Sequence, residues 1–124
     1  MMKARIFFMA VILMLTSCFS TRNWQSTDTE QSFNGSFEEF SGMGLLKEIK
    51  LNDQTIELDY SLKKIKGELT FQVESKRKGV ILNKKVVRDI NESFSYNTVG
   101  DDILYIKLIA ELAEGEYNID YHLK

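Results

Sequence analysis

Alternation of apolar and polar residues is the feature that most limits the folds open to this 124-residue chain. In a strand, successive side chains point to opposite faces, so a period of two predicts one face in a core and the other in water. Antiparallel sheets commonly show this one-sided burial. The alternation therefore predicts an all-β, antiparallel fold. Its three clearest apolar series are Ile56-Leu58-Tyr60-Leu62, Leu69-Phe71-Val73 and Tyr117-Ile119-Tyr121-Leu123.

Weaker strand patterns and short turn sequences fill the gaps between these series. The turns carry Gly, Asn or Asp, which tolerate turn conformations. Together the segments give about seven to eight strands, which predicts an antiparallel β-sandwich or a small barrel. The weaker strands are predicted over residues 33–40, 44–51, 79–87 and 93–99. The turns are predicted at Asn52-Asp53, Lys66-Gly67, Lys78-Gly79, Gly100-Asp101 and Glu114-Gly115.

Residues 103–113 have a mixed pattern. Leu104, Leu108 and Leu112 are spaced as on one face of a helix, and the Ala, Leu and Glu residues around them favour helix. The isoleucines and the tyrosine of the same segment favour strand, and the neighbouring segments are strands. We expect a strand whose last residues bend or coil.

The N-terminus has the organisation of an export signal. Lys3 and Arg5 supply a basic start, and Ile6–Leu15 is an uncharged apolar run. Such a run covers about 15 Å as a helix, roughly half of a bilayer core of ~30 Å. The length therefore favours a signal-peptide core over a membrane span.

Leu15-Thr16-Ser17-Cys18 resembles the lipobox of bacterial lipoproteins, with an aliphatic residue, two small residues and cysteine in order. The resemblance implies cleavage after Ser17 and fatty acyl (palmitate-type) modification of Cys18. The protein would then be anchored on the extracytoplasmic face of the cell membrane, or of the outer membrane in a Gram-negative source. Lipidation would also account for the chain's one cysteine, which has no internal disulfide partner. The alternative is a generic secretory leader with an incidental cysteine.

Composition divides the chain into three expected parts. Residues 1–17 are the signal peptide, residues 18–32 a lipid-anchored flexible tether, and residues 33–124 one β-sandwich domain. The tether is expected because its polar residues show no strand or helix period. Trp24 in this segment is expected either at the lipid headgroups or folded back onto the domain.

Three short motifs, KGELTF (66–71), KGVIL (78–82) and GEYNIDY (115–121), resemble strands of small lipoproteins of low-GC Gram-positive bacteria. The resemblance implies a β-sandwich and an extracytoplasmic location. It adds no catalytic residue. This chain has Lys76-Arg77-Lys78-Gly79 where that family has a "DPxGK" turn.

Charge is distributed unevenly. Residues 63–88 contain nine basic residues against two acids, whereas residues 89–124 contain eight acids against two bases. One interpretation is ordinary solvated turns and strand edges. The other is a patch facing an anionic envelope polymer, such as lipid headgroups or teichoic acid, or an acidic protein; nucleic acid is not expected outside the cell. The basic residues are Lys63, Lys64, Lys66, Lys76, Arg77, Lys78, Lys84, Lys85 and Arg88.

No residue pattern indicates catalysis, a metal or a cofactor. His122 is the single histidine, and no Gly-x-Ser-x-Gly motif occurs. Glu38-Glu39 and Asp101-Asp102 are adjacent acids typical of solvated turns, and calcium needs about six to eight oxygen ligands. We expect a non-catalytic interaction module for an envelope polymer or a partner protein. The alternative is a structural or accessory surface lipoprotein without a small-molecule ligand.

Overall fold

The computed structural model describes residues 19–124, so the predicted signal peptide and Cys18 lie outside the described residues. Within that range the chain forms six strands and no helix, and accordingly no helix there is long and apolar enough to cross a membrane. The strands are β1 (Phe19–Asp28), β2 (Ser32–Asn52), β3 (Thr55–Ser75), β4 (Gly79–Lys85), β5 (Ile90–Asn97) and β6 (Asp101–Leu123).

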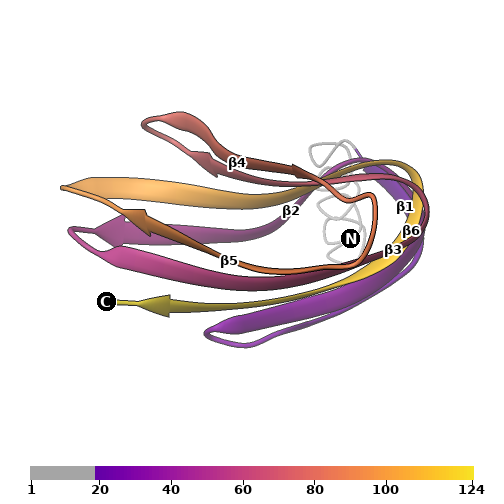
Figure 1. Cartoon of the computed structure of the whole chain (residues 1–124), viewed down its shortest axis with the longest axis horizontal. Coiled ribbons are helices and arrows are strands. Elements are labelled where there is room, and N and C mark those ends of the chain that lie inside the picture. The colour runs from indigo at the N-terminus through magenta and orange to yellow at the C-terminus, as the bar shows by residue number, and fades with distance from the viewer. Residues whose placement is uncertain (1–18) are drawn as a thin grey trace, which may run out of the picture.

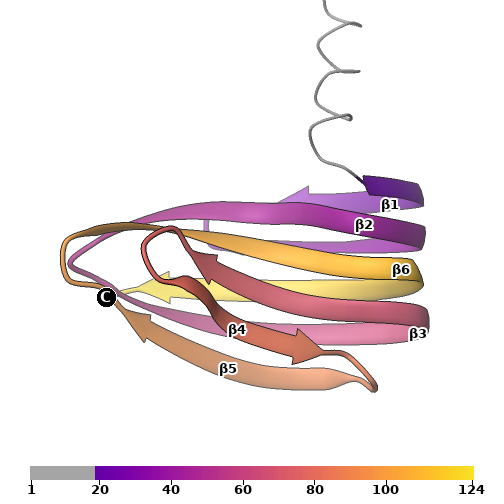
Figure 2. The same cartoon turned by 90° about the horizontal axis from the view of Figure 1, so that it is seen from above.

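All six strands belong to one antiparallel sheet in the order β1-β2-β6-β3, with β5 paired to the first half of β3 and β4 to its second half. β2, β3 and β6 have 21, 21 and 23 residues, about 70 Å each if straight. Instead they bend back together, so that two halves of the sheet face each other (Figures 1 and 2). The first layer contains β5, the start of β3, the end of β6, the start of β2 and the end of β1. The second layer contains β4, the end of β3, the start of β6 and the end of β2.

The bend is built from β-bulges at the same level of the three long strands. The β2–β6 register shifts on both sides of Phe40, and the β3–β6 register shifts on both sides of Lys66. Positive φ angles occur at Glu39 (49°), Gly67 (81°) and Leu112 (47°). Bulges add residues to one strand of a pair and kink it, so each strand turns without losing its neighbours.

The core lies between the two layers. Tyr60 and Phe71, both in β3, stack across it with ring centroids 4.7 Å apart. On the β1 side, Trp24 packs against Phe37 and Phe40 at 5.2 and 5.1 Å. The alternating apolar series predicted from the sequence are buried here, apart from the C-terminal Leu123, which is 38% exposed.

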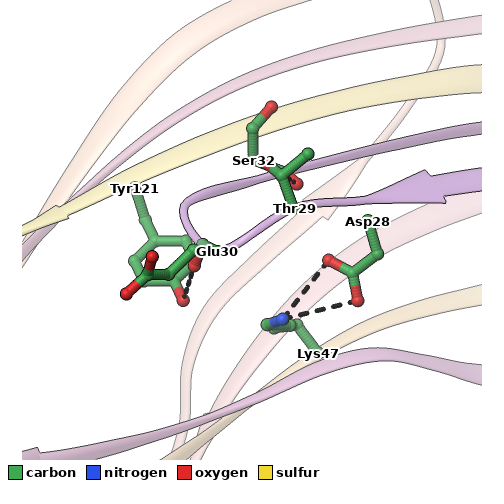
Figure 3. Close-up of polar contacts among 6 residues, drawn as sticks. All are labelled: Asp28, Thr29, Glu30, Ser32, Lys47 and Tyr121. Atoms are coloured by element: carbon green, nitrogen blue, oxygen red, sulfur yellow. Dashed lines mark hydrogen bonds and ion pairs between the residues drawn. The ribbon is translucent and has the colours of Figure 1, made fainter.

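At each open side of the folded sheet, an ion pair joins the two layers. On one side Lys47 of the second layer lies 3.3 Å from Asp28 of the first (Figure 3). On the other side Lys84 of β4 lies 3.1 Å from Glu92 of β5, which also accepts a hydrogen bond from the Tyr60 hydroxyl at 3.0 Å. Charged side chains of this kind protect edge strands from further pairing.

The Tyr60–Glu92 contact changes the proton affinity of both groups. Burial, together with the hydrogen bond to the Glu92 carboxylate, raises the pKa of Tyr60 to about 12. Hydrogen bonds from Lys84 and Tyr60 lower the pKa of Glu92. Both shifts favour the protonated phenol and the charged carboxylate, the states in which this hydrogen bond forms.

The β1–β2 turn is fixed to the C-terminal strand. The Tyr121 hydroxyl donates to the Glu30 carbonyl oxygen at 2.6 Å (Figure 3), and the Tyr121 N–H donates to the Gln31 carbonyl oxygen at 2.9 Å. Within the turn, the backbone N–H and hydroxyl of Thr29 both donate to the Ser32 carbonyl oxygen, at 2.7 and 3.0 Å. Glu30 and Gln31, in the turn that follows β1, are thus tied to the last strand.

The all-β antiparallel prediction is confirmed, and residues 103–113 are strand. The sheet is folded over rather than closed into a barrel, since β1 pairs only with β2. The predicted number of strands is wrong. Lys66-Gly67 and Glu114-Gly115 are not turns between strands but parts of the bend inside β3 and β6, and residues 33–40 and 44–51 form one strand, β2.

The predicted flexible tether is also wrong for residues 19–28, which form β1 and pair with β2. The polar composition suggested a flexible segment, but β1 is an edge strand. It is held by backbone pairing with β2 and not by an apolar face. Trp24 is the exception. Its ring folds back onto the domain, as the second of the two alternatives had it.

Gly67 should be essential to the bend. A Cβ there would overlap the backbone at Leu112 and Ala113, whereas at Gly79, with a similar φ of 85°, nothing lies within 4 Å. We expect Gly79→Ala to cost about 1–2 kcal/mol of unfolding free energy, the strain of a left-handed residue. Gly67→Ala should cost about 2–5 kcal/mol, because steric overlap adds to that strain. Denaturant unfolding of both variants measures the difference, and equal losses would contradict this account of the bend.

Candidate functional site

A row of polar side chains crosses the outer face of the first layer, with one member from each of its five strands. The register pairs Thr27 with Asn34, Asn34 with Asn118, Asn118 with Ser61, and Ser61 with Asn91. We call these five residues the polar ladder. Four strand spacings of ~4.8 Å give the ladder a length of about 19 Å.

A groove of about 800 Å³ follows the polar ladder. The next row of the sheet towards the bend also lines it, with Gln25, Ser36, Glu116 and Lys63. A smaller hollow of about 390 Å³ shares the first three of these residues and continues to Ile65 at the bend. The outer face is therefore hollowed from the polar ladder to the bend.

The floor of the groove depends on Gly35 and Tyr117, which are paired in register. Tyr117 is 5% exposed and its ring points into the core, where burial raises the pKa of its phenol. A Cβ on Gly35 would lie 2.6 Å from the Tyr117 hydroxyl and 2.7 Å from the Gln25 carbonyl oxygen. The groove consequently offers polar side chains and no exposed aromatic ring to a ligand.

Two asparagines of the polar ladder are free to bind. Ser61 donates to the Asn91 side chain at 3.3 Å, but within residues 19–124 the amides of Asn34 and Asn118 make no side-chain hydrogen bond and both are exposed. Each amide offers two donor hydrogens and an acceptor oxygen. Such groups suit a neutral ligand that carries both donors and acceptors, such as a chain of hydroxyl groups.

The charged side chains in and beside the groove are mostly acidic. Lys63 and Glu116 are paired in register within it, and Asp89 lines its β5 end. One row beyond the polar ladder, Asp59 and Asp120 are paired in register, and Asp59 accepts a hydrogen bond from Ser93 at 2.6 Å. The groove is therefore not a basic site.

The nine basic residues proposed for anionic contact fall into three groups along β3 and β4. The first lies in the bend, the second in the β3–β4 turn, and the third at and just after the end of β4. Lys85 pairs with Thr70, so the turn group lies about 20 Å along the sheet from the third group and about 30 Å from the bend group. The groups are Lys63, Lys64 and Lys66; Lys76, Arg77 and Lys78; and Lys84, Lys85 and Arg88.

Several of these cations already have partners. Lys66 lies 3.8 Å from Glu114, and Lys84 pairs with Glu92. Arg77 donates to two carbonyl oxygens of the β5–β6 turn, at 2.8 and 3.2 Å. The basic residues do not form one patch, because the β3–β4 hairpin lies along the sheet and places its two ends far apart.

Asp102 is a buried carboxylate rather than a solvated turn acid, with 5% exposure. The Ser75 and Tyr96 hydroxyls donate to Oδ2 at 2.6 and 3.0 Å, and the backbone N–H groups of Ile103 and Arg77 donate to Oδ1 at 2.8 and 3.3 Å. Burial raises the pKa of this carboxyl, but the four hydrogen bonds together outweigh burial and lower the pKa. The cluster joins the β3–β4 turn to β5 and β6.

Asp102→Asn should destabilise the domain at neutral pH by about 1–3 kcal/mol, because it removes charge-assisted hydrogen bonds. A lowered folded-state pKa means that this stabilisation is present above the ordinary pKa of 3.8 and is lost as pH falls through the folded value. The difference between variant and parent should therefore shrink in acid. Asp101→Asn, next in sequence but exposed, is the matched control. A difference that stays constant below pH 3.8 would contradict the assignment.

The other sequence candidates lie apart from the groove. His122 is exposed near the end of β6, in register with Glu57. No group of three or more His, Cys, Asp or Glu side chains that could hold a metal ion occurs among residues 19–124. The polar ladder was missed from the sequence. Its members stand on the outward parity of their strands, but only the strand register brings them into one row.

The sequence matches no protein-family model and no curated protein. Among solved structures, the fold is similar to the CBM22-1 xylan-binding domain of Paenibacillus barcinonensis Xyn10C, with 14% identity, TM-score 0.42 and 85% of each chain covered. It is also similar to a cupin domain from Bordetella pertussis, with 12% identity and TM-score 0.34 over 84% of this chain and 93% of that one. Similarity at this level carries no inference about ligand or activity.

Proposed function

We propose that this protein is a lipid-anchored, extracytoplasmic binding module, without catalytic activity, whose groove holds a neutral, hydroxyl-rich envelope polymer, a glycan chain. The observation that carries the proposal is the polar ladder: five amide and hydroxyl side chains in one row, with a groove of about 800 Å³ above them. The remainder of the proposal comes from the lipobox-like sequence Leu15–Cys18.

The chemistry of the groove favours a neutral polymer over an anionic one. Hydroxyl groups donate and accept hydrogen bonds, as do the free amides of Asn34 and Asn118. An anionic polymer would need gathered and unpaired cations. In the groove, Lys63 stands opposite Glu116, and the other basic residues are dispersed. A length of about 19 Å along the ladder suits several units of an extended chain rather than a single small molecule.

Replacement of both free asparagines, Asn34→Ala with Asn118→Ala, should abolish retention of the protein on isolated cell-wall glycan and leave the melting temperature nearly unchanged. Both side chains are exposed and make no internal hydrogen bond within the described chain, so their loss affects a ligand and not the fold. Co-sedimentation with the purified polymer measures retention, and thermal unfolding measures the fold.

A matched control lies on the outer face of the second layer. There Gln72 donates to the Asn83 side chain at 3.2 Å, and Asn83 is exposed. Gln72→Ala with Asn83→Ala removes the same chemical groups away from the groove, so retention should persist. If neither the parent nor the control binds any envelope glycan, the result contradicts glycan binding in the groove. It then favours the alternative of a structural surface lipoprotein.

The anchor has its own test. Cys18→Ser should leave the protein uncleaved or release it from the membrane fraction, because the Ile6–Leu15 run is too short to span a bilayer core of ~30 Å. Mass spectrometry of the parent should find a fatty acyl modification on an N-terminal Cys18. Unchanged membrane retention of an unlipidated Cys18→Ser protein would sink the lipoprotein interpretation.

A further inference from the structure

β1 begins at Phe19, directly after the proposed lipidation site. Phe19 pairs with Gly42, and Gly42 pairs with Ala110, at the level of the bend (Figure 2). If Cys18 carries lipid, no flexible spacer separates the lipid from the sheet. The strand that follows the anchor must then hold the bend close to the bilayer surface.

The bend exposes two large apolar side chains. Leu112 is 64% exposed and Ile65 is 57% exposed. The Leu112 N–H donates to the Ser41 hydroxyl at 2.9 Å, and Ser41 pairs with Ser20 of β1. Leu112 is therefore two strands from β1, about 10 Å from the chain that leaves the anchor, and Ile65 of β3 is one strand farther.

The side chains around this apolar pair carry both charges. Lys63, Lys64 and Lys66 lie in the same bend of β3, and Glu114 of β6 pairs with Lys66 at 3.8 Å. Lysine side chains can place their stems along apolar surface and their ammonium groups at phosphates. Glu68 and Glu111, paired in register, also lie at the bend. The two exposed apolar tips, and not a net positive charge, therefore suit the bend to the boundary between headgroups and acyl chains.

We infer that the bend is a membrane-contact surface, in which Ile65 and Leu112 enter the headgroup–acyl boundary while the turns at the other end point away from the bilayer. The inference rests on the lipid attachment proposed above. It also locates the turn group of Lys76, Arg77 and Lys78 about 30 Å from the membrane, since Lys76 is nine residue steps along the chain from Gly67. That group would then face the envelope and not the lipid.

The single cysteine makes a direct test available. Lipidation blocks the thiol of Cys18, so a second cysteine becomes the one free thiol of the mature protein. Ile65→Cys, Leu112→Cys and, as the control at the opposite end, Val99→Cys (82% exposed) are each labelled with an environment-sensitive dye. The lipidated proteins are placed in phosphatidylethanolamine–phosphatidylglycerol vesicles, with and without nitroxide-bearing lipid.

The expected result is blue-shifted emission and strong nitroxide quenching at positions 65 and 112, with neither effect at position 99. Two bend positions are used because Leu112 has a positive φ of 47°, and unfolding curves confirm that each variant is folded. Equal quenching at all three positions, or none at 65 and 112 in vesicle-bound protein, overturns the orientation and leaves the anchor intact. Labelling of Cys18 in the parent protein, together with loss of vesicle binding, overturns the anchor and with it this inference.

Discussion

The close approach of backbone to backbone at the bend is the constraint on which the rest of the molecule depends. Gly67 lies against the backbone at Leu112 and Ala113, and Gly115 lies against Lys63, in both cases without room for a Cβ. These contacts let β3 and β6 stay paired while they change direction. Both layers, the core between them and the groove outside them follow from that change of direction.

The ion pairs at the two sides concern the exposed edges of the folded sheet. A sheet folded over once leaves two gaps between its layers, and each gap exposes strand edges. Lys47 with Asp28 and Lys84 with Glu92 span these gaps, with Tyr60 hydrogen-bonded beneath the second pair. The aromatic stacking of Tyr60 and Phe71 fills the interior. Apolar packing therefore holds the layers together, and charge limits what else can join them.

Local sequence was enough to predict which residues face the core, but not how the strands are connected. Parity places Leu58, Phe71 and Ile119 inside correctly, because alternation is a property of each strand alone. Glycine in Lys66-Gly67 and Glu114-Gly115 is equally consistent with a turn or a bulge, and only contact between the two strands decides it. The polar ladder needs the register of five strands, which no single segment contains. β1 lacks alternation because, as an edge strand, it is held mainly by backbone pairing with β2 and buries few side chains.

The position of β6 between β2 and β3 sets the order in which the protein can acquire its structure. β2 and β3 do not pair with each other anywhere in the sheet. Each pairs with β6, which follows both of them in the sequence. Such long-range pairing is slow to form, so the β1–β2 hairpin and the group of β3, β4 and β5 cannot join into one sheet before Asp101–Leu123 is made. If the protein is exported, as proposed above, the late pairing of β6 delays assembly of the complete sheet while the chain crosses the membrane.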